Sequence, residues 1–172
     1  MVMVTMGEKL TKKDVERIEE EIMHRKLVVR KEALEAVKEA RAQGDLSENF
    51  EYTAAKKEKN RNESRIRYLE RMLKNATVIS EESADDCVGL NDTVILYFED
   101  DEEDETYRLV TSIRGNSLEG RISIDSPLGK AISGHRIGDR VLVPVEGRGG
   151  YYVTIKAIDK TGDDGSDQLR SY

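Results

Sequence analysis

Three carboxylates lie close together in residues 44–52, which read GDLSENFEY, and they belong to Asp45, Glu48 and Glu51. Carboxylate oxygens suit Mg²⁺, which often takes only one or two protein carboxylates and fills its shell with water and substrate phosphate. Asp45 and Glu48 are the first candidates, and Glu51 is the second choice because a helix residue can point back from the tip. Two carboxylates on a solvated tip would hold Mg²⁺ weakly by themselves, so an ion here would need ligands from a partner.

The spacing of Asp45 and Glu48 also has a purely structural interpretation. Asp-x-x-Glu matches the capping box, in which the first side chain caps the helix and the fourth reaches back. On spacing alone the cap is the better explanation, because such boxes are common. The two roles are compatible, since a carboxylate has several acceptor sites.

Long charged segments lead into this stretch and out of it. Thr11 is a suitable N-cap, and apolar residues then recur at steps of three, four and seven, which predicts a helix to about Gln43. The apolar stripe consists of Val15, Ile18, Ile22, Val29, Ala33, Val37 and Ala40. Gly44 suits the end of that helix. A second helix is predicted from Leu46 or Ser47 to about residue 75, which makes an antiparallel hairpin.

The inner face of the second helix is apolar only near its ends. Ala54 and Ala55 open it, and Ile66, Leu69 and Leu73 close it, whereas residues 56–65 are all polar or charged. We therefore expect polar pairs and the stems of long side chains to fill the middle of the hairpin. The best packing should lie at its base.

The second half of the chain shows short β-strand signals. We expect a small antiparallel α+β domain, and the predicted parts are a hairpin domain 1–78 with its tip at 44–52, a linker 79–88, a domain 89–159 and a flexible tail 160–172. Within the domain we predict strands at 93–98, 106–110, 122–124, 140–145 and 151–157, an acidic loop at 99–105, and a short helix at 127–133 after Ser126-Pro127.

Composition narrows the function classes. Charged and hydrophobic residues each make up 37%, there is one cysteine, and no run of 18 apolar residues occurs, so we expect a cytoplasmic protein without disulfides. Residues 1–80 carry 18 basic and 15 acidic groups (+3), and residues 81–172 carry 10 and 20 (−10). The acidic half favours a protein partner over nucleic acid.

The two halves together resemble the bacterial GreA/GreB transcript-cleavage factors over about residues 7–158. Residues 44–52 are similar to the family's G-D-L-x-E-N-x-E-Y tip, within the longer matching stretch 40–56. Residues 126–134, SPLGKAISG, are similar to its S-P-[IL]-[AG]-x-A-[IL]-x-G stretch. Phe50 departs from the usual Ala and makes the tip bulkier.

The resemblance implies a coiled-coil hairpin, an FKBP-like C-terminal domain, and a partner, RNA polymerase. The C-terminal domain would dock at the rim of the secondary channel, and we assign this contact to Ser126, Pro127, Leu128 and Gly134. The hairpin would bring Asp45 and Glu48 to Mg²⁺ in the polymerase active centre, to assist cleavage of backtracked RNA in trans. Tyr52 and Lys56 match positions near the RNA 3′ end. The chain would have no cofactor of its own, would not be an enzyme by itself, and would act as a monomer.

Several weaker candidates keep two interpretations. Tyr52 can stack on an RNA base or pack across the hairpin end. Lys56, Lys57, Lys59 and Arg61 can follow a phosphate backbone or simply form a solvated helix face. His24, His135 and Cys87 lack the spacing of a metal or catalytic site. Two rival functions remain: a paralogue of the same fold that occupies the channel and inhibits, and a structural or chaperone-like hairpin protein whose tip is irrelevant.

Overall fold

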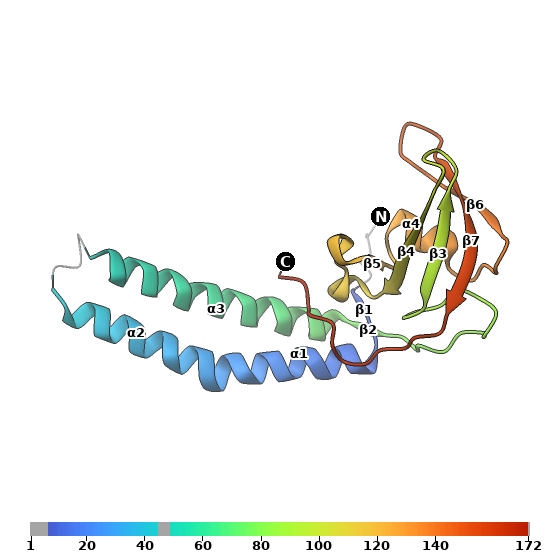
Figure 1. The fold of residues 1–172 in the computed structure, drawn as a ribbon. Helices are drawn as coiled ribbons and strands as arrows, with labels where there is room; N and C mark the ends of the chain where they lie inside the picture. The colour runs from blue at the N-terminus through green and yellow to red at the C-terminus, as the bar shows by residue number, and fades with distance from the viewer. Residues whose placement is uncertain (1–6, 45–48, 172) are drawn as a thin grey trace, which may run out of the picture. The chain divides into compact units, whose positions relative to one another are not determined.

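The structure, a computed structural model, describes residues 7–44 and 49–171. The chain divides into two compact units (Figure 1). One contains Lys13–Thr77 and is helical, and the other contains Glu8–Lys12 with Val78–Tyr172 and holds a sheet. The predicted α+β class, a helical hairpin followed by a small sheet domain, is confirmed.

The first arm of the hairpin is one continuous helical rod, and the second returns alongside it (Figure 1). Its parts are α1 (Lys12–His24), a π-helical turn (Arg25–Val29), α2 (Arg30–Ala42) and, in the returning arm, α3 (Phe50–Asn75). The backbone at His24 and Val29 stays in the right-handed helical region, so the π-turn does not break the rod. At 1.5 Å per residue the first arm is about 46 Å long.

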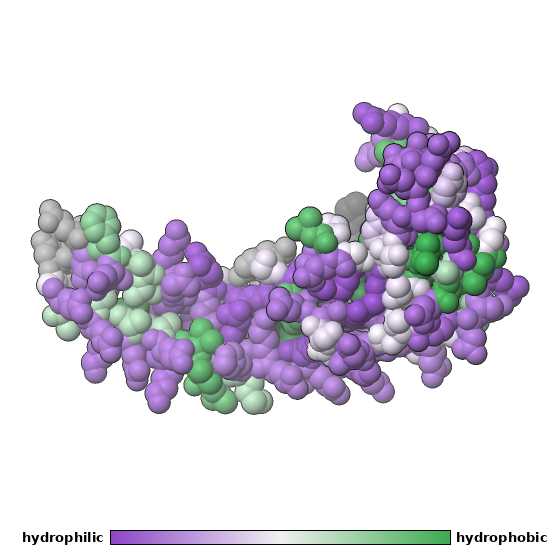
Figure 2. All heavy atoms as spheres, viewed as in Figure 1, coloured by the Kyte–Doolittle hydropathy of each residue, from purple (hydrophilic) through white to green (hydrophobic). Residues whose placement is uncertain are grey.

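Apolar packing in the hairpin is concentrated at its base, as predicted. The buried side chains there are Ile18, Ile22, Ile66, Leu69 and Met72. Leu73 is only half-buried, and Met72 takes the buried position beside it. The face of the hairpin seen in Figure 2 is mostly hydrophilic, and these buried side chains supply most of the hydrophobic stabilisation.

Polar pairs fill the middle of the hairpin, which confirms the prediction for residues 56–65. Arg30 donates from Nε and Nη2 to the two carboxylate oxygens of Glu63, at 2.7 and 3.0 Å. Asn62 is buried; it accepts from Arg25 Nη1 at 3.0 Å and donates to the Arg25 carbonyl at 3.3 Å. Because that carbonyl belongs to the π-turn, the amide of Asn62 satisfies backbone at the irregular part of the helix.

The second unit is built on a five-stranded sheet in the order β5-β4-β3-β7-β6. The elements are β3 (Thr93–Phe98), β4 (Glu103–Val110), β5 (Arg121–Ser123), α4 (Pro127–Ile132), β6 (Arg140–Val143) and β7 (Tyr151–Asp159). Its core contains Val94, Leu96, Leu109, Ile132, Val153 and Ile155, all fully buried. The predicted strands and short helix are therefore present.

One strand pair differs from the all-antiparallel sheet that we expected. β5 runs parallel to β4, with Leu109 opposite Ile122. Between these strands lie two 3₁₀ turns, Ser112–Arg114 and Ser117–Glu119. A parallel neighbour needs a crossover longer than a hairpin turn, and this connection supplies it.

The acidic loop is shorter than predicted, because β4 begins at Glu103. Glu103 lies opposite Phe98, and Glu105 lies opposite Leu96. The turn itself closes at Glu102, whose φ is +53°. Exposed acidic side chains are compatible with a strand when backbone pairing to β3 satisfies their amide and carbonyl groups.

Two further predictions need correction near the ends of the second unit. The lead-in contains β1 (Lys9–Leu10), which pairs with β2 (Thr77–Val78). Val88, placed in the linker, is buried in the core of the sheet domain. Strands of two residues carry too little periodicity to be recognised in a sequence.

Residues 160–171 have no regular secondary structure, but they are packed rather than forming the predicted flexible tail. Asp163 and Asp167 are buried, and the Arg170 N–H donates to the Ile113 carbonyl at 2.7 Å. The prediction rested on the scarcity of apolar residues. Ion pairs with arginines distant in the sequence hold this segment instead.

Candidate functional site

The two first candidates of the hairpin tip, Asp45 and Glu48, lie outside the described residues. The structure describes their frame. Gly44 ends the first arm with φ +132°, a conformation that a residue with a Cβ rarely adopts. On the other side, α3 begins at Phe50, later than the predicted start at Leu46 or Ser47.

Asn49, which the sequence reasoning missed, is the N-cap of α3. Its side-chain oxygen accepts from the Tyr52 N–H at 3.0 Å, and its side-chain amide donates to the Ala40 carbonyl at 2.6 Å. One side chain thereby caps α3 and ties it to the last turn of α2. The predicted capping box, with Asp45 as the cap, is therefore wrong for α3. The missed signal was Asn itself, which is among the best N-cap residues.

Tyr52 lies in the first turns of α3 and is partly covered by α2. The guanidinium carbon of Arg41 is 5.7 Å from the centre of its ring, within cation–π range. Hydrogen bonding to Arg41, with smaller contributions from Lys56 and Lys59, lowers the pKa of the Tyr52 phenol. Packing across the hairpin end is thus observed for Tyr52, and its half-buried ring keeps some exposed surface.

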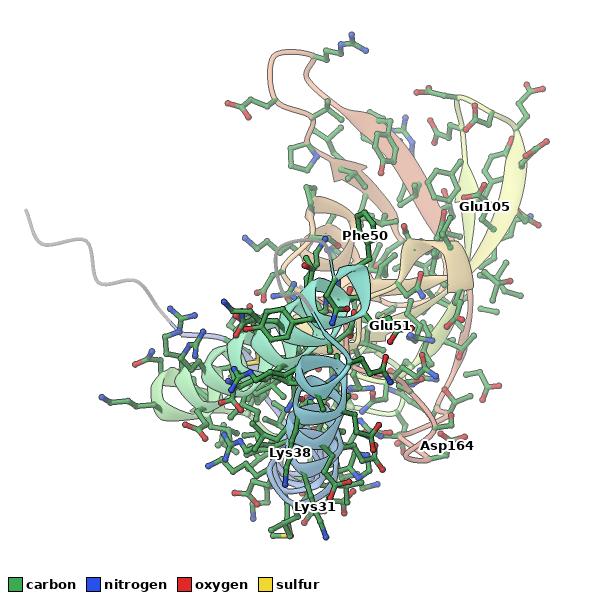
Figure 3. All side chains as sticks on the ribbon, turned by 90° about the vertical axis from the view of Figure 1, so that its left-hand side faces the viewer. Lys31, Lys38, Phe50, Glu51, Glu105 and Asp164 are labelled. Atoms are coloured by element: carbon green, nitrogen blue, oxygen red, sulfur yellow. The ribbon has the colours of Figure 1, made fainter. Side chains whose placement is uncertain are left out.

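The outer surface of the tip combines one large apolar group with charges (Figure 3). Phe50 is 88% exposed, and Glu51 beside it is exposed in the first turn of α3, where a negative charge is favoured. Lys56 and Lys57 are exposed, whereas Arg61 pairs with Glu58 at 2.6 Å. Lys56 and Lys57 are therefore the better placed of the predicted phosphate-tracking residues.

The predicted docking residues lie around α4. Ser126 caps this helix, accepting from the Gly129 N–H at 3.0 Å, and Pro127 follows in its first turn and is exposed. Leu128 packs partly against the core of the sheet. Gly134 is exposed with φ +80°, and its N–H donates to the Val88 carbonyl at 2.8 Å. Ser126 and Leu128 thus shape α4, while Pro127 and Gly134 are available at the surface.

A shallow groove of about 530 Å³ runs beside α4. Its lining residues are Asp125, Pro127, Lys130, Ala131, Leu142, Pro144, Val145 and Glu146. Only Pro127 among them was predicted as a docking residue. The others come from the residues before α4, from α4, from β6 and from the segment after β6, so packing of distant segments brings them together.

Other candidate centres are weak in the described part of the chain. Residues 7–44 and 49–171 contain no group of three His, Cys, Asp or Glu side chains placed to hold a metal ion. His135 contacts Asp139 at 3.1 Å, and Cys87 is a half-buried free thiol. Across the same ranges, we find no helix with the length and apolar character needed to cross a bilayer.

Comparisons with known proteins cover almost the whole chain. The family model described as transcription elongation factor, N-terminal, matches residues 8–78, and that described as transcription elongation factor, GreA/GreB, C-term, matches residues 82–160. A relative from Geobacillus kaustophilus, named transcription elongation factor GreA, is 45% identical over 87% of this chain and 94% of its own length. The GreA of Bacillus subtilis is 38% identical over 80% and 88%.

A solved structure gives a further similarity in sequence. The crystal structure of GreA factor homolog 1 of Thermus thermophilus is 31% identical, covers 88% of this chain and 98% of that one, and superposes with a TM-score of 0.41. The two family models account for both units and end at residue 160. This chain therefore belongs to the GreA/GreB family of transcription elongation factors.

Proposed function

We propose that this chain binds RNA polymerase in the cytoplasm, inserts its hairpin into the secondary channel and stimulates the polymerase's own cleavage of backtracked RNA. The chain acts as an accessory factor. The observation that carries the proposal is the hairpin itself: two helical arms, the first about 46 Å long, joined by the acidic segment 45–48 and held together at that end by Asn49.

The end of the hairpin is built to present a short segment in a fixed frame. Asn49 supplies the cap of α3 with its own side chain. Because Asn49 supplies this cap, α3 does not need Asp45 for it, which supports a different role for the carboxylates of Asp45 and Glu48.

The donor set of Asp45 and Glu48 suits Mg²⁺, whose affinity for a few carboxylates is low without further ligands. When bound, Mg²⁺ neutralises charge at the scissile phosphate and lowers the pKa of water. In this proposal the role of Asp45 and Glu48 is to add two negative oxygen donors where the polymerase supplies the other ligands. Alone, the chain has no nuclease activity.

Tyr52 and Lys56 lie one helical turn apart on α3, so they face the same side near the tip. We assign Lys56 to a phosphate of the RNA 3′ end, because its ammonium group is exposed. Arg41 holds Tyr52 from the α2 side, which leaves the rest of the ring for contact with a base.

For the C-terminal unit we propose docking on a polymerase protein surface through the groove beside α4. The exposed Pro127 lines it together with the apolar Leu142 and Val145, and Lys130 and Glu146 supply charged groups. Such a mixture of apolar and charged groups is typical of a protein interface. The net charge of −10 in residues 81–172 disfavours nucleic acid here.

The test uses polymerase stalled in a backtracked complex with end-labelled RNA. The full chain with Mg²⁺ should shorten the RNA, and the chain without polymerase should not. Asp45→Asn and Glu48→Gln should each reduce the stimulated rate by roughly 10–100-fold, the range seen when groups supporting a metal site are lost. Glu39→Gln is the matched control, because Glu39 is an exposed acid on α2 away from segment 45–48.

The same assay separates the rivals. An inhibitory paralogue would slow RNA synthesis without shortening the transcript. A structural or chaperone-like hairpin would be indifferent to Asp45→Asn. Full activity of both carboxylate variants would refute the proposed role of the tip.

A further inference from the structure

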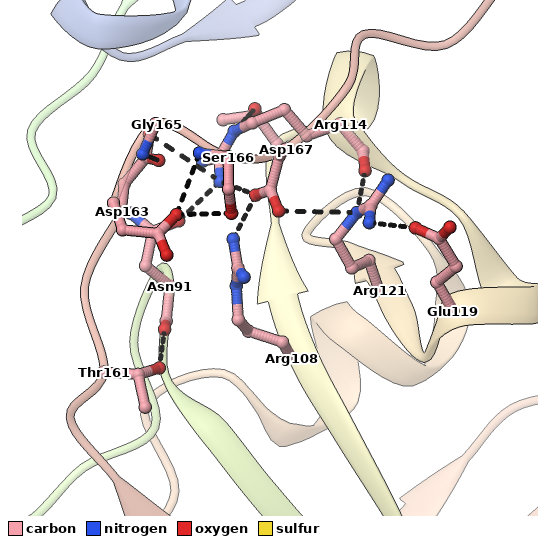
Figure 4. Close-up of polar contacts among 12 residues, drawn as sticks. Asn91, Arg108, Arg114, Glu119, Arg121, Thr161, Asp163, Gly165, Ser166 and Asp167 are labelled. Atoms are coloured by element: carbon pink, nitrogen blue, oxygen red, sulfur yellow. Dashed lines mark hydrogen bonds and ion pairs between the residues drawn. The ribbon is translucent and has the colours of Figure 1, made fainter.

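The C-terminal segment 161–171 lies against a cluster of three arginines in the same unit (Figure 4). Arg108 belongs to β4, Arg114 to the 3₁₀ turn that follows it, and Arg121 to β5. The family match ends at residue 160, so this contact lies beyond what family membership describes.

A single carboxylate contacts all three arginines. Asp167 pairs with Arg108, lies 3.0 Å from Arg114 Nη1, and lies 3.8 Å from Arg121 Nε. Asp163 adds a second carboxylate 3.9 Å from Arg114. The arrangement is that of an anion held by convergent guanidinium groups, with a side chain of the same protein as the anion.

The cluster is buried, so its charges require a partner. Arg114 is fully buried, and Asp163 and Asp167 are 7% and 8% exposed. Arg114 Nη1 also donates to Asn91 Oδ1 at 2.7 Å, and Arg121 Nε donates to the Arg114 carbonyl at 2.8 Å. These contacts hold the guanidinium groups of Arg114 and Arg121 through residues outside the segment.

The segment also has contacts outside the arginine cluster, among them an ion pair of Arg170 with Glu8 at 2.8 Å. It forms no strand within residues 161–171. The Arg170 N–H donates to the Ile113 carbonyl at 2.7 Å, and the Thr161 hydroxyl donates to the Asn91 carbonyl at 2.7 Å. The ion pairs of Asp163 and Asp167 thus form one part of the attachment, and an anion that competes for the three arginines can replace that part.

We propose that Arg108, Arg114 and Arg121 form an oxyanion-binding site whose resident ligand is the chain's own C-terminal segment. The competing ligand class is a phosphate-type oxyanion, since guanidinium groups bind phosphate and carboxylate with the same fork geometry. The segment is then a displaceable intramolecular ligand, and phosphate binding and release of residues 161–171 are coupled.

In this proposal, tethering of the segment keeps dilute anions out of the site. A ligand joined by a short linker has an effective concentration on the order of millimolar or more, which a free anion must exceed. Asp167→Asn removes the charge that reaches all three arginines while keeping the side-chain shape. This variant should weaken docking of the segment and let inorganic phosphate bind at a concentration at least about tenfold lower than in the unchanged chain.

The experiment follows the Arg170 amide by hydrogen exchange in the full chain, because its hydrogen bond to Ile113 reports docking. Inorganic phosphate should accelerate exchange more than chloride at matched ionic strength. Phosphate binding, followed as a rise in melting temperature, should occur at lower concentration in Asp167→Asn and disappear in Asp167→Asn/Arg108→Gln. The matched control is Asp164→Asn, an exposed acid in the same segment that accepts hydrogen bonds from Ser166.

If Asp167→Asn binds phosphate no better than Asp164→Asn, the cluster is only a structural ion-pair network and the proposal is overturned. If Asp167→Asn fails to fold, the unchanged chain decides: equal effects of phosphate and chloride on the Arg170 amide overturn the proposal, and a larger effect of phosphate supports it.

Discussion

Replacing Asn49 by Ala tests the frame of the hairpin tip most directly. The change removes the acceptor for the Tyr52 N–H and the donor to the Ala40 carbonyl. Loss of an N-cap costs about 1 kcal/mol, and loss of a partly buried side-chain hydrogen bond costs a further ~1 kcal/mol. The end of the hairpin should therefore lose about 2 kcal/mol, with little change at the apolar base.

Asn49→Asp is the matched variant, because Asp keeps the capping oxygen but cannot donate to Ala40. It should lose only the second contribution, about 1 kcal/mol. Hydrogen exchange of the Tyr52 amide measures both variants locally. A loss of about 2 kcal/mol corresponds to roughly 30-fold faster exchange, and about 1 kcal/mol to roughly fivefold.

Equal protection of the Tyr52 amide in the Asn49→Ala variant and the unchanged chain would refute this reasoning, because the cap would then contribute nothing. Equal loss in the Ala and Asp variants would show that only the tie to Ala40 matters. RNA cleavage by backtracked polymerase complexes should fall in the same order as the protection of the Tyr52 amide, because Asp45 and Glu48 belong to the segment that directly precedes Asn49.

Three further predictions concern stability. Arg30 lowers the pKa of Glu63 below its ordinary value of 4.5, so the ion pair stabilises the fold above pH 4.5 and loses this effect as the pH falls through the lower pKa of the folded state. Glu63→Gln should therefore lower the free energy of unfolding in urea by about 0.5 kcal/mol at pH 7. A loss of the same size in acid would contradict this assignment. In Gly129→Ala the new Cβ would lie 2.0 Å from the Ser123 carbonyl oxygen, and the overpacking should cost about 1–3 kcal/mol in the same measurement; unchanged stability would mean that α4 shifts freely. Leu69→Ala, at a fully buried position, should cost about 2–5 kcal/mol, and a smaller loss in thermal unfolding would show that the hairpin base is not the main packing zone.

Some features of the hairpin could be predicted because they are local. The apolar stripe of α1 and α2 and the charged gap in α3 follow from helical periodicity, and the structure confirms both. The polar pairs at Asn62 and Glu63 were expected as a class. Their individual partners were not, because several register shifts of the two arms pair an acid or amide with an arginine.

The start of α3 shows how a local pattern can mislead. Asp45 and Asn49 are both good N-cap residues four positions apart, and intrinsic preference hardly separates them. The contact of the Asn49 amide with Ala40 favours the later start. That contact exists only when the chain has turned back and the start of α3 lies beside the end of α2, so it is a tertiary effect.

By itself, the sequence determined the α+β class, the hairpin and the succession of strands along the chain, because periodicity and turn residues act over a few residues. Only the tertiary structure decided the cap of α3, the parallel β4–β5 pair, the groove beside α4 and the docking of the C-terminal segment on Arg108, Arg114 and Arg121. Each of these depends on residues far apart in the chain, whose pairing is selected by burial and charge once the elements have come together.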